Sequence, residues 1–495
     1  MDRRGARAPP WRAQAPDPDL KYALTDVLIV GAGSAGCVLA ERLSSDSNCQ
    51  VTIVEAGPGP SDPQVVAQIS DGLRLPIGEA SSVVRRYRTT LTESPERSAV
   101  IMRGAVVGGS GAVNGGYFCR GLPSDFASWK LPGWSWADVL PHFLAIETDL
   151  DFAGPLHGAD GPMMIRRVSE FDEGARAFVR AARELGYEWI DDLNGVGGAA
   201  PGVGAVPLNI DGGTRVGPGG AFLGPASTRP NLSVRERTHV LAVRFVNGRA
   251  VGVECDGPDG QEYLEADRII LSAGAIGSAH LLMLSGIGPA AALRSMDITV
   301  HSDAPVGTRC ADHPEWVLPV DWPAAPGRPP LEAVLTTSDG LELRSYTAGF
   351  GAMTGGPGVD PADRPHFGVT LMRPRSRGRV RLASPDPAVA PVIEHRYDSE
   401  PADVAALEVG AELAHHLAGT GYEVRESFWS TSQHLAGTAP MGTDEDDSVL
   451  DEQCRVRGVE GLWVVDGSIM PSITSRGPHA TIVMIGHRAA EFILR

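Results

Sequence analysis

A short glycine pattern, Gly31-Ala-Gly33-Ser-Ala-Gly36, follows directly on the apolar run 27–30. Such a run is typical of a strand covered on both faces, and residues 37–43 after the glycines have a helical pattern. Between a strand and a helix, the first glycine makes the tight turn and the second lets a pyrophosphate approach the backbone. The third lets the helix pack closely on the strand. The segment therefore predicts a Rossmann-like α/β fold that binds a dinucleotide.

The next predicted strand and the acidic residue after it narrow the choice of dinucleotide. Residues 51–54 are apolar, and Glu55 follows them, 19 residues after Gly36. An acidic side chain at this place can accept hydrogen bonds from both ribose hydroxyls of an adenosine, which favours FAD or NAD over NADP. The pattern does not choose between FAD and NAD, and a purely structural turn is the alternative.

The size and charge of the chain exclude several classes of protein. Its 495 residues are several times a usual domain of about 100–200 residues, so we expect more than one core. A net charge of −18 argues against a nucleic-acid partner, because that partner needs a basic face. No cluster of histidines, cysteines or carboxylates has the spacing of metal ligands, so we expect no metal.

Two segments need to be distinguished from targeting and membrane signals. Residues 1–22 are rich in Arg and Pro and have no apolar core, so we expect a disordered leader and not a signal peptide. Residues 269–293 carry no formal charge, but four glycines and a proline interrupt them, which predicts a strand, a turn and a helix. We therefore expect no transmembrane segment and a cytoplasmic location, with peripheral association at the inner face of the cell membrane as a second possibility.

Apolar strand patterns recur in the middle and at the end of the chain, near residues 268–271 and 462–465. In flavoproteins a final strand and helix of this kind close over the flavin, an analogy that favours FAD over NAD. The remaining residues have mixed helix and strand patterns. We predict a dinucleotide-binding domain assembled from residues 23–125, 211–300 and 450–495, and a substrate-binding domain assembled from residues 126–210 and 301–449.

A second glycine loop and one histidine add candidate site residues. Residues 108–116 are dense in backbone N–H donors that could lie against a flavin or cover phosphates, and a loop without chemistry is the alternative. His434 lies in Gln-His-Leu-Ala-Gly-Thr-Ala-Pro-Met-Gly, which is too interrupted for a regular helix. Taken alone, such a histidine is by default structural.

Together these stretches resemble the glucose-methanol-choline (GMC) oxidoreductases, FAD enzymes that oxidise alcohols. Residues 31–36 with Glu55 resemble the FAD fingerprint of the family, residues 108–114 its first signature and residues 274–288 its second. His434-x-x-Gly-Thr-x-x-Met-Gly is similar to the segment that carries the active-site histidine. The resemblance implies a Rossmann-like FAD-binding domain built from discontinuous segments. It also implies an α+β substrate-binding domain with an antiparallel sheet, as in GMC and PHBH-like flavoproteins.

The resemblance also implies which residues hold FAD. Val113 stands where some members attach FAD covalently to a histidine, so we expect non-covalent FAD. The expected FAD-binding residues are Gly31, Gly33, Ser34, Ala35, Gly36, Glu55, Ala56, Gly108, Gly109, Ser110, Asn114, Gly115, Val240, Ala273, Gly274, Asp466, Gly467, His479 and Ala480.

The largest departure from the family lies near the end of the chain. The family usually places Asn and then Pro four and three residues before the threonine that is Thr481 here, whereas this chain has Gly477 and Pro478. His479 is the nearest candidate for a second catalytic residue, a donor to the substrate oxygen. The alternative is a histidine at the start of a helix. His487, farther along the same apolar helix, is expected to be structural.

The expected reaction is a two-electron oxidation of an alcohol. His434 would take the hydroxyl proton as general base, and the carbinol carbon would deliver hydride to flavin N5. A narrower likeness, to the mycofactocin-associated GMC dehydrogenase, rests on residues 84–88, 114–123 and 477–480. It implies oxidation of a reduced mycofactocin, a peptide-derived redox carrier, with electrons passed to an acceptor of the respiratory chain.

Three other interpretations stay open. One is a GMC oxidase or dehydrogenase that acts on another small alcohol. Another is a nicotinamide dehydrogenase, which would be colourless when purified. The last is a non-catalytic FAD electron-transfer protein, which the glycine at position 477 would permit.

Overall fold

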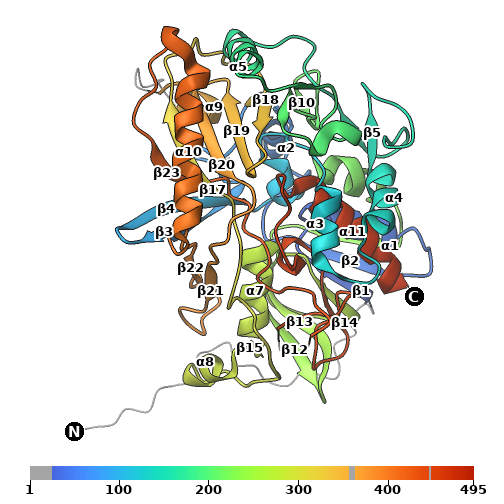
Figure 1. Cartoon of the computed structure of the whole chain (residues 1–495). Coiled ribbons are helices and arrows are strands. Elements are labelled where there is room, and N and C mark those ends of the chain that lie inside the picture. Colours follow the sequence, from blue (N-terminus) through green and yellow to red (C-terminus); the bar gives the residue numbers. More distant parts are fainter. Residues whose placement is uncertain (1–24, 356–362, 445–446, 495) are drawn as a thin grey trace.

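The computed structural model of the chain describes residues 25–355, 363–444 and 447–494. The predicted leader, residues 1–22, lies outside the described residues. Two large sheets lie in different parts of the molecule, one at the lower right of Figure 1 and one at its upper left, and each has its own helices.

The first sheet joins strands from the front, the middle and the end of the chain. Its parallel part has β1 (Thr25–Val30) between β2 (Val51–Val54) and β14 (Gly260–Leu271), and β24 (Leu462–Val464) pairs with β14. Residues 27–30 are at most 4% exposed, as the apolar run predicts for a strand covered on both faces. The predicted Rossmann-like fold is confirmed. The sheet is extended by β11 (Leu232–Arg235) beyond β2, and by β13 (Arg249–Gly257) and β12 (His239–Val246) beyond β14.

Helices from both ends of the chain pack together beside this sheet. The glycine turn leads into α1 (Ser34–Leu43), and α11 (His479–Leu494) lies next to it, as Figure 1 shows. At their contact, a Cβ on Gly486 would lie 2.8 Å from the carbonyl oxygen of Ala35, so only glycine allows this close approach. The C-terminal segment is thereby fixed against the first turn of the nucleotide fold.

The uncharged segment 269–293 folds as its glycines predict. It contains the end of β14, then α7 (Gly274–Leu284), β15 (Ile287–Gly288) and the start of α8 (Ala290–Ser295). In the described part of the chain, no helix is both long and apolar enough to cross a membrane.

The second large sheet is almost entirely antiparallel. At its centre β17 (Pro314–Pro319), β20 (His366–Leu371), β19 (Leu341–Tyr346) and β18 (Leu331–Thr336) pair in this order. Its edges are β23 (Phe428–Thr431) on one side and β8 (Gly202–Ala205) with β7 (Trp189–Ile190) on the other. The long helix α10 (Pro401–Ala418) covers one face (Figure 1) and forms a second apolar core with α5 (Glu173–Glu184). The predicted antiparallel α+β part is confirmed.

A smaller sheet of four strands draws on both predicted domains. The hairpin of β3 (Val84–Glu93) and β4 (Glu96–Gly104) pairs with β22 (Val392–Glu394), which pairs with β21 (Arg379–Arg381). The hairpin belongs to the predicted FAD-binding segment and the other two strands to the predicted substrate-binding segment. We keep the predicted division of the chain as a proposal.

Candidate active site

The three glycines of the first turn have different surroundings. Gly31 has a positive φ of 101°, and a Cβ on Gly36 would lie 2.0 Å from the carbonyl oxygen of Gly31. A Cβ on Gly33 would find its nearest protein atom only at 3.7 Å, the carbonyl oxygen of Ser272. Gly31 and Gly36 are therefore required by the fold itself, whereas Gly33 leaves an open approach to the backbone.

Glu55 closes the turn from the second strand. Its carboxylate accepts from the backbone N–H groups of Ala32 (3.0 Å) and Gly57 (2.9 Å), and the residue is 8% exposed. The N–H of Thr238 donates to the Glu55 carbonyl at 2.8 Å, which brings the start of β12, and with it Val240, to the same edge of the sheet. Burial raises the pKa of Glu55 to about 7, against the effect of the backbone hydrogen bonds.

The raised pKa of Glu55 predicts a pH-dependent stability of the apoprotein. A carboxyl whose pKa is higher in the folded than in the unfolded state stabilises the fold when protonated, so its contribution is lost as the pH rises towards and past 7. We expect the difference in unfolding free energy between the wild type and Glu55→Gln to change by about 2 kcal/mol between pH 5 and 8. Denaturation of both apoproteins across this range measures it, and the same pH dependence in both would contradict the prediction.

The second glycine loop lies directly on the first. The N–H of Gly108 donates to the carbonyl of Ala32 at 2.7 Å, and a Cβ on Gly109 would lie 2.6 Å from the Cα of Gly33. Farther along the loop, the Asn114 side chain accepts from the N–H of Gly116 at 3.0 Å. The two loops predicted to hold FAD, 31–36 and 108–116, therefore meet at Gly33.

A buried arginine supports the second loop. The Arg215 guanidinium donates to the backbone carbonyls of Asn114 (3.0 Å) and Ala112 (3.4 Å), and the residue is 3% exposed. Burial lowers its pKa to about 10, so the group stays charged at neutral pH. Sequence reasoning did not find Arg215, because nothing in its neighbourhood along the chain marks it as part of this loop.

Asp466 ties the C-terminal segment to the middle of the chain. One carboxylate oxygen accepts from the N–H of Gly274 (2.8 Å) and the hydroxyl of Ser278 (2.5 Å), and the other accepts from the N–H of Ser468 (2.8 Å). A Cβ on Gly31 would lie 2.9 Å from the Cα of Ala273. Ala273, Gly274, Asp466 and Gly467 thus lie beside the first glycine turn, although they are far apart in sequence.

His479 lies against both glycine loops. A Cβ on Gly111 would lie 2.6 Å from His479 Nε2 and 2.7 Å from Ser34 Oγ. The ring is packed edge-on against Phe118, and burial lowers its pKa to about 4, so it is neutral. Within the described residues, neither buried ring nitrogen has a hydrogen-bond partner.

These unpaired nitrogens test whether the site fits FAD. A buried N–H without a partner is costly, and the open backbone at Gly33 lies beside the same loops. The oxygens of the FAD phosphates and ribityl chain are acceptors of the kind that an imidazole N–H needs. The residues present therefore fit FAD. They favour a cofactor role for His479, whose helix begins at this residue, and a second catalytic role for it remains a prediction.

His434 is held at its backbone and at its ring. Its N–H donates to Asp312 Oδ1 at 2.7 Å, and the same oxygen accepts from the N–H of His313 at 2.8 Å. His434 Nδ1 lies 2.8 Å from His313 Nδ1, and His313 Nε2 lies 3.0 Å from the carbonyl oxygen of Thr474. Burial lowers the pKa of His434 well below its usual value and that of His313 to about 4.

The unusual glycine at 477 borders this histidine. A Cβ at Gly477 would lie 3.5 Å from His434 Cε1 and 3.0–3.1 Å from two ring carbons of Tyr117. The Tyr117 hydroxyl donates to Glu342 at 2.8 Å, which fixes the ring from the antiparallel sheet. A side chain at position 477 would therefore crowd the Tyr117 ring.

Three residues of this group were not found from the sequence. Asp312 and His313 lie 121 or more residues before His434, and no known motif links them to it. Tyr117 follows the glycine loop directly and looks like part of it in the sequence. The sequence offered one local signal of this site, the adjacent pair Asp312 and His313 directly before a strand, because neighbouring titratable residues are candidates for an active site. Only the pairing of the sheets brings them together.

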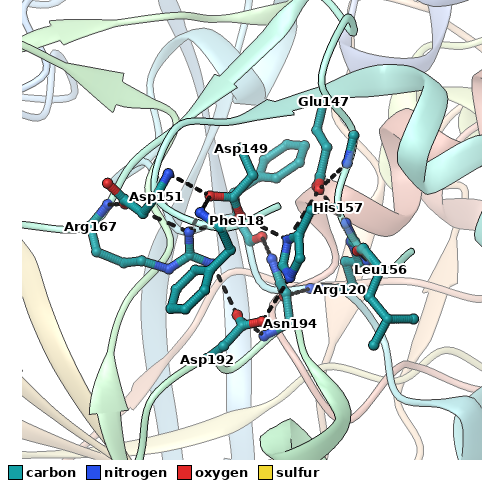
Figure 2. A network of polar contacts seen from close by, with 12 residues as sticks. Phe118, Arg120, Glu147, Asp149, Asp151, Leu156, His157, Arg167, Asp192 and Asn194 are labelled. Atoms are coloured by element: carbon teal, nitrogen blue, oxygen red, sulfur yellow. Dashed lines mark hydrogen bonds and ion pairs between the residues drawn. The ribbon is translucent and has the colours of Figure 1, made fainter. Parts of the chain in front are cut away.

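A largely buried network of ion pairs lies close to Phe118 (Figure 2). The Arg120 guanidinium contacts Glu147, and the Arg167 guanidinium donates to Asp149 (2.7 Å) and Asp192 (3.0 Å). His157 lies between two of these carboxylates, 3.1 Å from Asp149 and 2.8 Å from Asp192. Sequence spacing did not predict this cluster.

Part of this network has the geometry of a metal site. Glu147, Asp149 and His157 offer ligand atoms within 4.8 Å of one another. However, Arg120 and Arg167 already donate to both carboxylates, so two positive charges stand where an ion would have to bind. We interpret the cluster as structural.

The network fixes the segment that carries Tyr117. Asn194 accepts from the N–H of Arg120 at 2.9 Å and donates to the carbonyl of Phe118 at 3.3 Å (Figure 2). Tyr117 and Phe118 then contact Gly477 and His479 respectively. The ion pairs thus set the position of two residues on the wall of the site.

Comparison with known proteins agrees with this geometry. The family of GMC oxidoreductases matches residues 25–315 with its N-terminal part and residues 374–486 with its C-terminal part. The chain belongs to the GMC oxidoreductase family. It is an FAD-dependent enzyme that acts on CH–OH groups.

Three similar proteins cover almost the whole chain. The uncharacterized GMC-type oxidoreductase in the thcA 5′ region of Rhodococcus erythropolis is 39% identical, over 95% of this chain and 98% of its own. An oxygen-dependent choline dehydrogenase of Rhizobium etli is 32% identical, with 95% of each chain covered. The crystal structure of pyridoxine 4-oxidase from Mesorbium loti has a TM-score of 0.85 and 28% identity, over 94% of this chain and 98% of that one.

Proposed function

We propose that this enzyme oxidises a reduced mycofactocin-type carrier and passes the electrons to a respiratory acceptor, with His434 as the general base. The observation that carries the catalytic part is the surroundings of His434. One ring nitrogen is held by His313, and the other has no protein partner in the described part of the chain. A histidine presented in this way, beside a glycine that brings no side chain of its own, is equipped to take a hydroxyl proton.

The residues that would hold FAD are different from the residue that would take the substrate proton. The glycine loops at Gly33 and Gly109, with Glu55 and His479, would hold FAD, which when bound supplies the two-electron oxidation. His434 orients the substrate hydroxyl and takes its proton. The half-buried ring of Tyr117, held by its hydrogen bond to Glu342, limits the space beside Gly477.

Support for the mycofactocin-type substrate comes from the sequence. The narrower likeness rests on three segments, and two of them, 114–123 and 477–480, meet at the contact of Tyr117 with Gly477. Gly477, the largest departure from the usual family pattern, lies next to His434, where we propose that the substrate hydroxyl binds. We place the acceptor in the respiratory chain because this likeness implies it.

A second candidate is a GMC oxidase or dehydrogenase that acts on another small alcohol. It is favoured by the similar proteins, which include an oxygen-dependent choline dehydrogenase and a pyridoxine 4-oxidase. In that case the enzyme would be reduced by simple alcohols and reoxidised by oxygen.

Anaerobic flavin reduction distinguishes these functions. The FAD-loaded enzyme is mixed with a reduced mycofactocin-type phenol or diol and, separately, with simple alcohols such as choline and pyridoxine. Reoxidation is then followed with oxygen and with a quinone. Fast reduction by the carrier and faster reoxidation by the quinone support the proposal. Reduction by a simple alcohol alone supports the second candidate, and no reduction by any of them indicates an electron-transfer protein.

A further inference from the structure

The hydrogen bonds around His313 determine where its proton is. Its Nε2 lies 3.0 Å from the carbonyl oxygen of Thr474, which can only accept, so Nε2 must carry the hydrogen. His313 is 0% exposed, and burial lowers its pKa to about 4, so the ring is neutral and Nδ1 has a free lone pair. The Nδ1 atom of His313 is therefore an acceptor.

This acceptor fixes the protonation of His434. The two Nδ1 atoms are 2.8 Å apart, and since His313 accepts, His434 must donate from its Nδ1. We infer that His313 is a positioning residue that holds His434 in the tautomer with hydrogen on Nδ1 and a free lone pair on Nε2. Without such a partner, either ring nitrogen of a neutral histidine can carry the hydrogen, and hydrogen on Nε2 makes the ring useless as a base there.

The arrangement is held at four points. Asp312 Oδ1 accepts from the backbone N–H of both histidines, which fixes the distance between their main chains. Asp312 Oδ2 accepts from the hydroxyls of Thr431 (2.8 Å) and Tyr397 (3.0 Å), so the carboxylate cannot rotate freely. The two rings stand at 87° to each other, with the Nδ1 atom of His434 2.8 Å from that of His313.

The inference rests on the proposed role of His434 and extends it. When the substrate hydroxyl gives its proton to Nε2, His434 becomes a cation, and its Nδ1–H bond to His313 becomes charge-assisted and stronger. The substrate proton ends on Nε2, and the Nδ1 proton stays shared with His313. His313 thereby stabilises the positively charged ring of His434, which forms only as the proton is transferred.

Nuclear magnetic resonance tests the tautomer without measuring turnover. In the oxidised, FAD-loaded enzyme with nitrogen-15-labelled histidine, long-range proton–nitrogen spectra distinguish protonated from unprotonated ring nitrogens. The signals of His434 are identified by their absence in His434→Gln. We expect hydrogen on Nδ1 and none on Nε2. Hydrogen on Nε2 of His434 would overturn the inference, whatever substrate the enzyme uses.

Substitutions test whether the tautomer matters. His313→Leu removes the acceptor, and we expect flavin reduction to slow about 10- to 100-fold, the cost known for losing a partner that orients a metal-ligating histidine. His313→Asn keeps an acceptor near the same place and should recover much of the rate. His142→Leu is the matched control, because His142 is also buried and its Nδ1 lies 2.8 Å from His487 Nδ1, outside the site.

These variants separate the two proposals. If a substrate reduces the flavin of the wild type and of His313→Leu at the same rate, the role of His313 is overturned. The proposed function then remains intact. No reduction of the wild type by any substrate would contradict the proposed function, while the tautomer in the spectra would still decide the inference. Slowing of His142→Leu to the same extent as His313→Leu would show a general effect of replacing a buried imidazole and would also overturn it.

Discussion

Replacing His434 by alanine is expected to lower the rate of flavin reduction by about 10²- to 10⁴-fold, the range that general-base catalysis usually contributes. The variant keeps the glycine loops, Glu55 and His479, so it should still bind FAD. Anaerobic mixing with a substrate that reduces the wild type, followed by flavin absorbance, measures the rate.

The flavin content of the purified variant is the control for this experiment. Normal content with slow reduction would locate the defect in the proton transfer. His434→Gln keeps a polar side chain without a base and should be about as slow as His434→Ala. Near-normal reduction in either variant would show that His434 is not the base.

The second large effect is expected at the glycine turn, where two substitutions of the same size should fail for different reasons. A Cβ at position 36 would lie 2.0 Å from a backbone oxygen, so Gly36→Ala must displace α1 from β1. A Cβ at position 33 meets no protein atom within 3.7 Å. Gly36→Ala should therefore destabilise the fold and abolish FAD binding.

Gly33→Ala is the matched variant. Its methyl group would point to where the loops approach the cofactor, and overpacking there should weaken FAD binding by about 1–3 kcal/mol, or roughly 5- to 150-fold. We expect the unfolding temperature of its apoprotein to equal that of the wild type. Titration with FAD and thermal denaturation measure both effects. Equal FAD affinity in Gly33→Ala and the wild type would contradict the position assigned to the cofactor.

The fold could be predicted from the sequence because its signals are local. A strand, three glycines and an acidic residue at the right spacing identify a Rossmann-like turn. The structure adds the reason for each glycine, such as the 2.0 Å contact at Gly36. The family, its FAD and its action on CH–OH groups are likewise confirmed. The mycofactocin-type substrate and the respiratory acceptor remain predictions, because no local pattern encodes the shape of a substrate pocket.

The active site was predictable only in part, for a physical reason. His434 stands in a recognisable segment, but the residues around its ring come from the segment just before β17 and from the loop after the second glycine motif. Hydrogen bonds between segments more than a hundred residues apart depend on the pairing of strands, which the sequence of one segment does not contain. The predicted role of His479 shows the same limit, since only its neighbours Ser34 and Gly111 distinguish a cofactor contact from a catalytic one.

The contact between Gly477 and Tyr117 has an evolutionary consequence. An asparagine introduced at position 477 would place its Cβ 3.0–3.1 Å from two carbons of the Tyr117 ring, which would then have to shift while its hydroxyl is bound to Glu342. The two positions are therefore epistatic. A chain that gains asparagine at 477 before it carries a smaller residue at 117 would pass through an overcrowded intermediate. Residues 117 and 477 should consequently change together among close relatives of this chain.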